Sequence, residues 1–231
     1  MRLVGLTGNI AAGKSTVAST LAADCGLHVI DCDAIAHDAV RPGRWAYRRV
    51  LAAFGPAITA DPAAPGSPLD RAALGALAFA DPAARRKLNA ATHLPILLTL
   101  LGRLLAAWLA CKAVVVVDMP LLFESGFWRV TSPRVLVDAP VGVRAARIQA
   151  RDGLSAAAAA DRLAAQASAA TKRPRCAWVI ENEGTFEEVA ATARRVGGAL
   201  WRGAWVHWAV SPPALVVAGA VAGVLARRGA R

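Results

Sequence analysis

The chain has 231 residues, enough for one large α/β domain or for one domain with an appendage. Its formal net charge of +11 favours nucleic acid, an anionic membrane surface or a phosphate-rich substrate as partner, but the scattered arginines without an aromatic-rich basic cluster argue against nucleic-acid binding. None of the four cysteines forms a C-x-x-C pair, so neither a zinc ribbon nor a thioredoxin-like site is indicated.

The first expected element is a short buried strand over residues 3–6, which leaves no room for a signal or transit peptide and predicts a catalytic domain facing the cytosol. A complete phosphate-binding loop follows, Gly8-Asn9-Ile10-Ala11-Ala12-Gly13-Lys14-Ser15, and a helix begins at its end. Such a loop turns backbone N–H groups toward phosphate oxygens, and the helix dipole favours the same anion. We expect the segment from Gly8 to Thr16 to bind ATP, with Lys14 on the β- and γ-phosphates and Ser15 on Mg²⁺.

A second strand is expected over residues 28–30, and Asp31-Cys32-Asp33-Ala34-Ile35-Ala36-His37 follows it directly. In an open α/β sheet, ligands bind beyond the carboxyl ends of the strands, so both aspartates are candidates for the active site. One carboxylate would face the nucleotide and the other would orient or deprotonate an acceptor hydroxyl. The alternative is that one or both of them cap the next helix.

A long insertion, about residues 41 to 112, separates the second and third strands. Four helical patterns lie in it, at residues 45–54, 71–79, 83–91 and 95–110, around a loop rich in proline and glycine at residues 61–68. We interpret the insertion as a helical substrate-binding subdomain; the alternative is a set of crossover helices with no binding role. Residues 94–111 are apolar, but Arg103 in their middle favours a domain helix over a membrane span.

Three more strands are expected, at residues 113–118, 134–137 and 177–180. With the first two they predict an α/β fold built on a five-stranded parallel sheet of the P-loop NTPase type. Asp118, at the end of the third strand, is a candidate acid near Mg²⁺ that would contact the ligands of the ion and not the ion itself. Phe123 either packs in the core or lines the adenosine pocket of the acceptor.

Arg144, Arg147 and Arg151 recur at helical spacing and should share one helix face, followed by an alanine-rich segment that reads as a mobile lid. The predicted lid covers about residues 144–170. Arg147 and Arg151 either stabilise the transferring phosphoryl group or belong to a solvated basic face.

Residues 204–226 contain no Asp, Glu, Lys or Arg. As a helix they would span about 35 Å, against a hydrocarbon core of about 30 Å. Trp201, Trp205 and Trp208 mark one end and arginines the other, which favours association with an intracellular membrane, although Pro212-Pro213 would break or kink the helix. A helix packed on the enzyme, or a disordered extension, is the alternative.

These motifs together resemble the dephospho-CoA kinase family, which phosphorylates the ribose 3′-hydroxyl of dephospho-CoA with ATP. The resemblance spans most of the chain, from Leu6 to about Val189, and is carried by the aspartate motif and by Pro120-Leu121-Leu122-Phe123-Glu124-Ser125-Gly126. Further matches are His93-Leu94-Pro95, Arg151-Asp152-Gly153, Gln166 and Asn182. The family loop usually has glycines or serine where Asn9, Ala11 and Ala12 stand, so we expect modestly altered nucleotide affinity.

The resemblance implies a kinase domain over residues 1–200, with the insertion binding CoA and a lid above the nucleotide. It implies Asp33 and Lys14 as catalytic residues, aided by Arg147, with Asn182 on the adenine side of ATP. The acceptor side would hold Asp31, Arg71 and Phe123. The alternatives are another P-loop kinase of nucleosides or nucleotides, and a membrane-tethered P-loop switch; the sequence does not give the oligomeric state.

Overall fold

The computed structural model describes residues 1–164 and 169–204. Gln166 of the predicted lid, and the predicted tail beyond Ala204, lie outside the described residues. The chain forms two compact units: one combines Met1–Ile30 with the chain from Ala106 onward, and the other is Asp31–Leu105. The second unit begins earlier in the chain than the predicted insertion, because it also contains the helix that carries Asp33.

The first unit is built on a five-stranded sheet with the strand order β2-β3-β1-β4-β5. Strand β1 is central, and its pairings with β3 and β4 are parallel, as is the pairing of β4 with β5. All five strands coincide closely with the predicted ones. Their bounds are β1 Arg2–Gly8, β2 His28–Asp31, β3 Val114–Asp118, β4 Arg134–Asp138 and β5 Trp178–Glu181.

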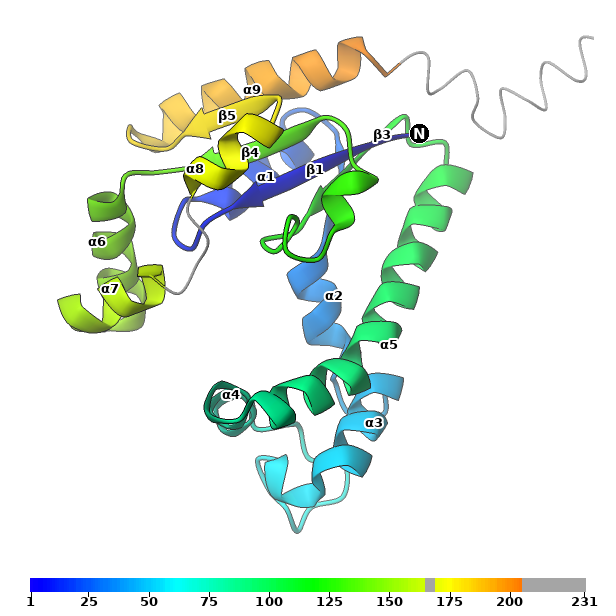
Figure 1. Ribbon diagram of the computed structural model, residues 1–231. Helices are drawn as coiled ribbons and strands as arrows, with labels where there is room; N and C mark the ends of the chain where they lie inside the picture. Colours follow the sequence, from blue (N-terminus) through cyan, green and yellow to red (C-terminus); the bar gives the residue numbers. More distant parts are fainter. Residues whose placement is uncertain (165–168, 205–231) are drawn as a thin grey trace, which may run out of the picture. The chain divides into compact units, whose positions relative to one another are not determined.

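Helices α1 (Lys14–Ala23) and α9 (Phe186–Arg202) cover one face of this sheet. Alternate residues of β1 and β3 point to that face and pack against apolar side chains of both helices, as the two-residue period of a strand requires. Figure 1 shows α9 running along the sheet in orange. The core that results fixes β1, and with it the start of the phosphate loop, at the centre of the unit.

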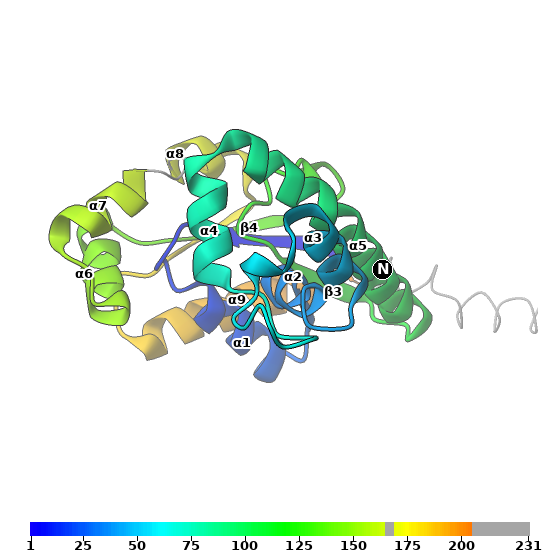
Figure 2. The same cartoon turned by 90° about the horizontal axis from the view of Figure 1, so that it is seen from below.

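The segment between β4 and β5 is helical. It contains α6 (Val141–Asp152), α7 (Ala156–Ala164), and the short α8 (Ala169–Lys172), with residues 165–168 outside the description. Figures 1 and 2 show α6 and α7 side by side. The predicted lid therefore corresponds to helices, although the motion that defines a lid remains a prediction.

The second unit consists of helices, as predicted for the insertion. Its members are α2 (Cys32–Ala39), α3 (Trp45–Phe54), α4 (Arg71–Ala80) and the first part of α5 (Pro82–Leu109). Tyr47, Val50, Ile58, Leu69, Leu74 and Ala91 form its small core. The loop before α4 is fixed by the Tyr47 hydroxyl, which donates to the Ser67 carbonyl at 2.7 Å.

Helix α5 corrects one prediction, because Pro95 lies inside it and does not separate two helices. A proline has no N–H to donate to the carbonyl four residues earlier, here that of Ala91. The guanidinium of Arg49 on α3 replaces the missing donor: Nε donates to the Ala91 carbonyl at 3.1 Å and Nη2 to the Ala90 carbonyl at 3.0 Å. The helix therefore continues past the proline, with a bend visible in Figure 1.

Among the described residues, α5 is also the one helix that is long and apolar enough to cross a membrane, a statement about length and composition only. Leu100, Leu104 and Ala107 of this helix are buried, whereas Leu98, Leu101, Leu105 and Leu109 are exposed. The interpretation of this segment as a domain helix therefore stays a prediction.

Candidate active site

The phosphate loop connects the end of β1 to the start of α1, as its motif predicts. Gly13 has a φ of +88°, and a Cβ atom there would lie 1.9 Å from Nδ2 of Asn182. Only glycine fits this position, because both the backbone conformation and the close approach exclude a side chain. Ala11, one of the departures from the family loop, also adopts a left-handed conformation, with a φ of +59°. Ser15 and Thr16 lie in the first turn of α1.

Lys14 and Asp118 form an ion pair at the carboxyl ends of β1 and β3. Lys14 Nζ lies 2.6 Å from Asp118 Oδ1, and the side chains are 16% and 4% exposed. The two strands are neighbours in the sheet, so their adjacent ends bring the loop lysine and this carboxylate together. The pair holds the ammonium at the mouth of the loop, where a nucleotide phosphate would meet it.

Arg147, on α6, reaches the phosphate loop, and its expected contact with the transferring phosphoryl group stays a prediction. Its Nη1 donates to the Ala11 carbonyl at 3.3 Å, and its Nη2 donates to Asn182 Oδ1 at 3.0 Å. Asn182 follows β5, is buried, and donates from Nδ2 to the Ala12 carbonyl at 2.8 Å. These contacts of Asn182 brace the loop, and the adenine-side role expected for it stays a prediction.

The other two arginines of α6 have different surroundings, although all three lie on this helix at the spacing expected for one face. Arg144 is buried, and its Nε donates to the Ala139 carbonyl at 2.9 Å, so it holds the start of its own helix. Arg151 is exposed and paired with Asp152, which also accepts from Arg162 at 2.6 Å. The hydrogen bond from Arg151 lowers the pKa of Asp152. Arg147 is thus the member of the set that contacts the loop.

Lys172, at the end of α8, is a neighbour of the loop that sequence reasoning missed. Its Nζ lies 3.2 Å from Asn9 Oδ1 and 3.2 Å from Glu124 Oε1, and the residue is 4% exposed. The two partners are far from it in the chain, so no local spacing points to the contact. The only sequence signal is a single lysine at the end of an alanine-rich stretch.

Phe123 lines a cavity of about 230 Å³ beside these residues, together with Glu124, Thr171, Lys172 and Arg175. Its ring also contacts Trp128, with centroids 6.1 Å apart. The half-buried ring thus takes part in packing and also borders a space, and the expected role in an adenosine pocket of the acceptor stays a prediction.

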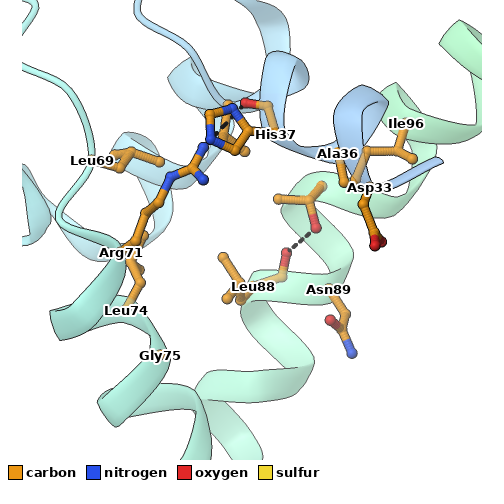
Figure 3. Close-up of a pocket in the computed structure, with 12 residues that line it drawn as sticks. Asp33, Ala36, His37, Leu69, Arg71, Leu74, Gly75, Leu88, Asn89 and Ile96 are labelled. Atoms are coloured by element: carbon orange, nitrogen blue, oxygen red, sulfur yellow. Dashed lines mark hydrogen bonds between the residues drawn. The ribbon is translucent and has the colours of Figure 1, made fainter. Parts of the chain in front are cut away.

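The second unit carries its own cavity, of about 500 Å³, lined by Asp33 and His37 of α2, Arg71 of α4 and Asn89 of α5. Apolar side chains complete the lining (Figure 3), among them Leu69, Leu74 and Leu88. The Arg71 guanidinium lies beside His37 and donates to its carbonyl at 3.4 Å. Asp31 is the N-cap of α2 and accepts from the Ala34 N–H at 2.9 Å, which is the capping role that the sequence left open.

A divalent cation in this family of loops needs oxygen ligands. Among the described residues, no group of three or more His, Cys, Asp and Glu side chains is placed to hold a metal ion by itself. The Ser15 hydroxyl and the Asp118 carboxylate are nevertheless hard oxygen donors at the loop, the type that Mg²⁺ prefers when nucleotide phosphates supply further ligands.

Comparison with known proteins identifies the family of the chain. The model of the family described as dephospho-CoA kinase matches residues 2–188. The chain belongs to the dephospho-CoA kinase family.

Curated members of the dephospho-CoA kinase family resemble the chain over most of its length. The dephospho-CoA kinase of Moorella thermoacetica is 42% identical over 92% of this chain and 96% of its own, and that of Arabidopsis thaliana is 37% identical over 82% and 79%. A solved structure from Thermus thermophilus has a TM-score of 0.72 at 34% identity and covers 86% of this chain and 97% of its own. The dephospho-CoA kinase structure from Campylobacter jejuni, with a TM-score of 0.58 at 23% identity, supports the fold. The chain is accordingly a kinase with a P-loop fold.

Proposed function

We propose that this kinase transfers the γ-phosphoryl group of ATP to the ribose 3′-hydroxyl of dephospho-CoA, the last step of CoA synthesis. The observation that carries the proposal is the extent of the family match. It covers residues 2–188 and so includes both the phosphate loop of the first unit and the Asp33 cavity of the second.

The nucleotide side of the proposal rests on the first unit. Backbone N–H groups of the loop from Gly8 to Ser15 would hold the phosphates, and Lys14 would exchange part of its contact with Asp118 for the β- and γ-phosphates. Arg147, already at the loop, would place positive charge near the transferring group. The Ser15 hydroxyl would bind Mg²⁺, and Asp118 would contact the ligands of the ion. The bound Mg²⁺ would neutralise phosphate charge.

The acceptor side of the proposal rests on the second unit. Asp33 would orient the acceptor hydroxyl and take its proton, and Arg71 would pair with the acceptor's phosphates. The apolar residues of the same cavity suit the uncharged part of a large acceptor. Asp31, which caps α2, would act by fixing the helix that presents Asp33. Phe123 is a candidate for stacking on the acceptor's adenine, because it borders a cavity in the first unit.

Acceptor dependence tests the proposal. Purified enzyme with ATP and Mg²⁺ should release ADP rapidly with dephospho-CoA and form CoA, and should release little ADP with nucleosides, nucleoside monophosphates or no acceptor. A faster reaction with a nucleoside or a monophosphate would favour the other P-loop kinases. ADP release that ignores every acceptor would favour a nucleotide switch.

Asp33→Asn separates the role of the carboxylate from that of the fold. We expect kcat to fall by roughly 10²–10⁴-fold, the usual contribution of a general base, while ATP affinity measured by direct titration stays near the wild-type value. Wild-type turnover in this variant would remove Asp33 from the mechanism.

We further propose that residues 204–226 attach the enzyme to a membrane, with the catalytic domain facing the cytosol. The support is compositional: the segment is long enough, lacks charge and is bounded by tryptophans and arginines. Carbonate extraction of the full chain and of a chain ending at Arg202 tests it. The full chain should stay with the membrane pellet and the shortened one in the supernatant; equal partition of the two would refute attachment.

A further inference from the structure

The phosphate loop is tied to the rest of the first unit by a buried lysine that lies outside the loop motif. Lys172 Nζ contacts Asn9 Oδ1 and Glu124 Oε1, each at 3.2 Å. Asn9 belongs to the loop, Glu124 to the segment after β3, and Lys172 to α8. One ammonium group thus connects three segments that are far apart in the chain.

Burial makes these contacts consequential. A charged group out of water is strongly unfavourable unless opposite charge and hydrogen-bond partners replace the solvent. Lys172 is 4% exposed, and Glu124 and Asn9 supply its ammonium group with one carboxylate oxygen and one amide oxygen. Removing either oxygen would leave the ammonium poorly compensated, so the position of Asn9 is linked to that of Lys172.

Asn9 is well suited to transmit this link to the loop. Its backbone carbonyl accepts from the Ala12 N–H at 3.1 Å, which closes the turn of the loop. Its side chain is held at the same time by Lys172. A glycine, which the family usually carries here, would leave the turn more flexible and would offer Lys172 no side-chain acceptor. Asn9 is therefore less free in its backbone conformation than a glycine would be, but Lys172 holds its side chain in place.

We propose that Lys172 is a positioning residue for the nucleotide phosphates, acting through Asn9, with Glu124 holding its ammonium group. This inference rests on the proposed kinase function and deepens its nucleotide side. The loop binds phosphate through backbone N–H groups that must converge on one site. If Lys172 already holds the loop at Asn9, the loop does not have to become ordered when phosphate binds, and binding is tighter. Loss of the tie weakens nucleotide binding and leaves the Asp33 cavity unchanged, because the lining residues of that cavity belong to the other unit.

The test measures the dissociation constants of ATP and ADP directly, by calorimetric titration of the full chain, together with both KM values. Lys172→Met should raise the ATP dissociation constant about tenfold, the usual effect of one hydrogen bond to a charged group. The KM for dephospho-CoA should rise less than the ATP dissociation constant, since the Asp33 cavity is untouched and Lys172 borders only the smaller cavity beside Phe123. Lys172→Arg should recover part of the affinity. Lys112→Met, at an exposed lysine of the same unit, is the matched control and should change neither value.

A double-mutant cycle shows whether Asn9 transmits the effect. Asn9→Gly should weaken ATP binding, and adding it to Lys172→Met should cause little further loss, because both remove the same contact. Independent, multiplying effects would mean that Lys172 contacts the phosphates by itself and would overturn the proposal.

Two further results would also overturn it. The first is an unchanged ATP dissociation constant in Lys172→Met, even with a lower melting temperature, since that is the mark of a purely structural lysine. If Lys172→Met does not fold, Asn9→Gly and Glu124→Gln carry the same test, and unchanged affinity in both is the second contrary result. Because the titrations need no acceptor, a failure to form CoA would count against the proposed function and leave this inference standing.

Discussion

At the scale of the residue, the phosphate loop combines one required glycine with one strained alanine. Gly13 and Ala11 both adopt positive φ angles, but only Gly13 is the residue type that does so freely. A left-handed conformation costs a non-glycine residue about 1–2 kcal/mol. The family's usual glycine at position 11 avoids that cost, so Ala11 lowers the free energy of unfolding of this chain.

Ala11→Gly should therefore stabilise the protein. Removing the strain at position 11 should stabilise the folded state by about 1–2 kcal/mol. Glycine also gives the unfolded chain more conformational freedom, which lowers the free energy of unfolding by about 0.4–1 kcal/mol. We therefore expect a net gain of about 0.5–1 kcal/mol in the free energy of unfolding. Urea denaturation measures it. Ala12→Gly is the control, since Ala12 is buried and its φ is not positive, and it should destabilise. A loss of stability in Ala11→Gly would show that the loop holds Ala11 without strain.

At the scale of the element, helix α5 depends on a side chain from another helix. Pro95 leaves the Ala91 carbonyl without its usual donor, and Arg49 supplies two donors to this turn. The proline and the arginine are therefore coupled, although they lie on different helices.

Arg49→Met should lower the free energy of unfolding by about 1 kcal/mol, the net value of such hydrogen bonds at a partly exposed site. In a Pro95→Ala background the cost should shrink, because residue 95 then donates its own N–H to the Ala91 carbonyl. Urea denaturation of the four proteins gives the coupling. Arg48→Met, at the exposed neighbour, controls for lost charge. Equal costs of Arg49→Met in both backgrounds would refute the coupling.

Helix α9 begins with a capping box, in which the Glu188 carboxylate accepts from the Thr185 N–H at 2.7 Å. This hydrogen bond lowers the pKa of Glu188 in the folded protein. A carboxyl whose pKa is lowered by folding stabilises the protein above its unfolded pKa, and the contribution disappears as the pH falls through the folded pKa. The capping box should thus be a neutral-pH contribution that acid removes.

Thermal melts of wild type and Glu188→Gln test this dependence. At pH 7 the wild type should melt at the higher temperature, and the difference should shrink steadily below about pH 4, where the glutamate begins to bind protons. Glu183→Gln, just before the helix, changes the same charge without touching the capping box and serves as control. A difference that stays constant from pH 7 to pH 3 would contradict the assignment.

At the scale of the whole molecule, the features that could be predicted are those that depend on residues close together in the sequence. Continuous valine runs such as 114–117 identify buried strands, and the loop motif and the two aspartates follow strand ends, so both the sheet and the position of Lys14 could be predicted. The continuity of α5 could not, because Arg49 acts on it across a tertiary contact. The different roles of Arg144 and Arg147 could not either: their spacing is helical, but what each meets depends on packing.

The positions of Arg71 and Arg147 in different units make a last prediction, that the two substrates can be weakened independently through these two residues. Arg71 lines the cavity of the second unit, whereas Arg147 contacts the loop in the first. Arg71→Met should raise the KM for dephospho-CoA by about tenfold, as expected for the loss of one charge-assisted contact, and leave the ATP dissociation constant unchanged.

Arg147→Met should show the opposite pattern, with a lower kcat and weaker ATP binding at an unchanged KM for dephospho-CoA, because its charge serves the transferring phosphoryl group. Steady-state kinetics with each substrate varied in turn, together with ATP titration, separate the two patterns. Arg85→Met, at an exposed position of α5 outside the cavity lining, controls for the loss of one positive charge from a basic protein. If Arg71→Met weakened ATP binding as much as acceptor binding, the two units could not be assigned separate substrates, and Arg71 would have to serve both.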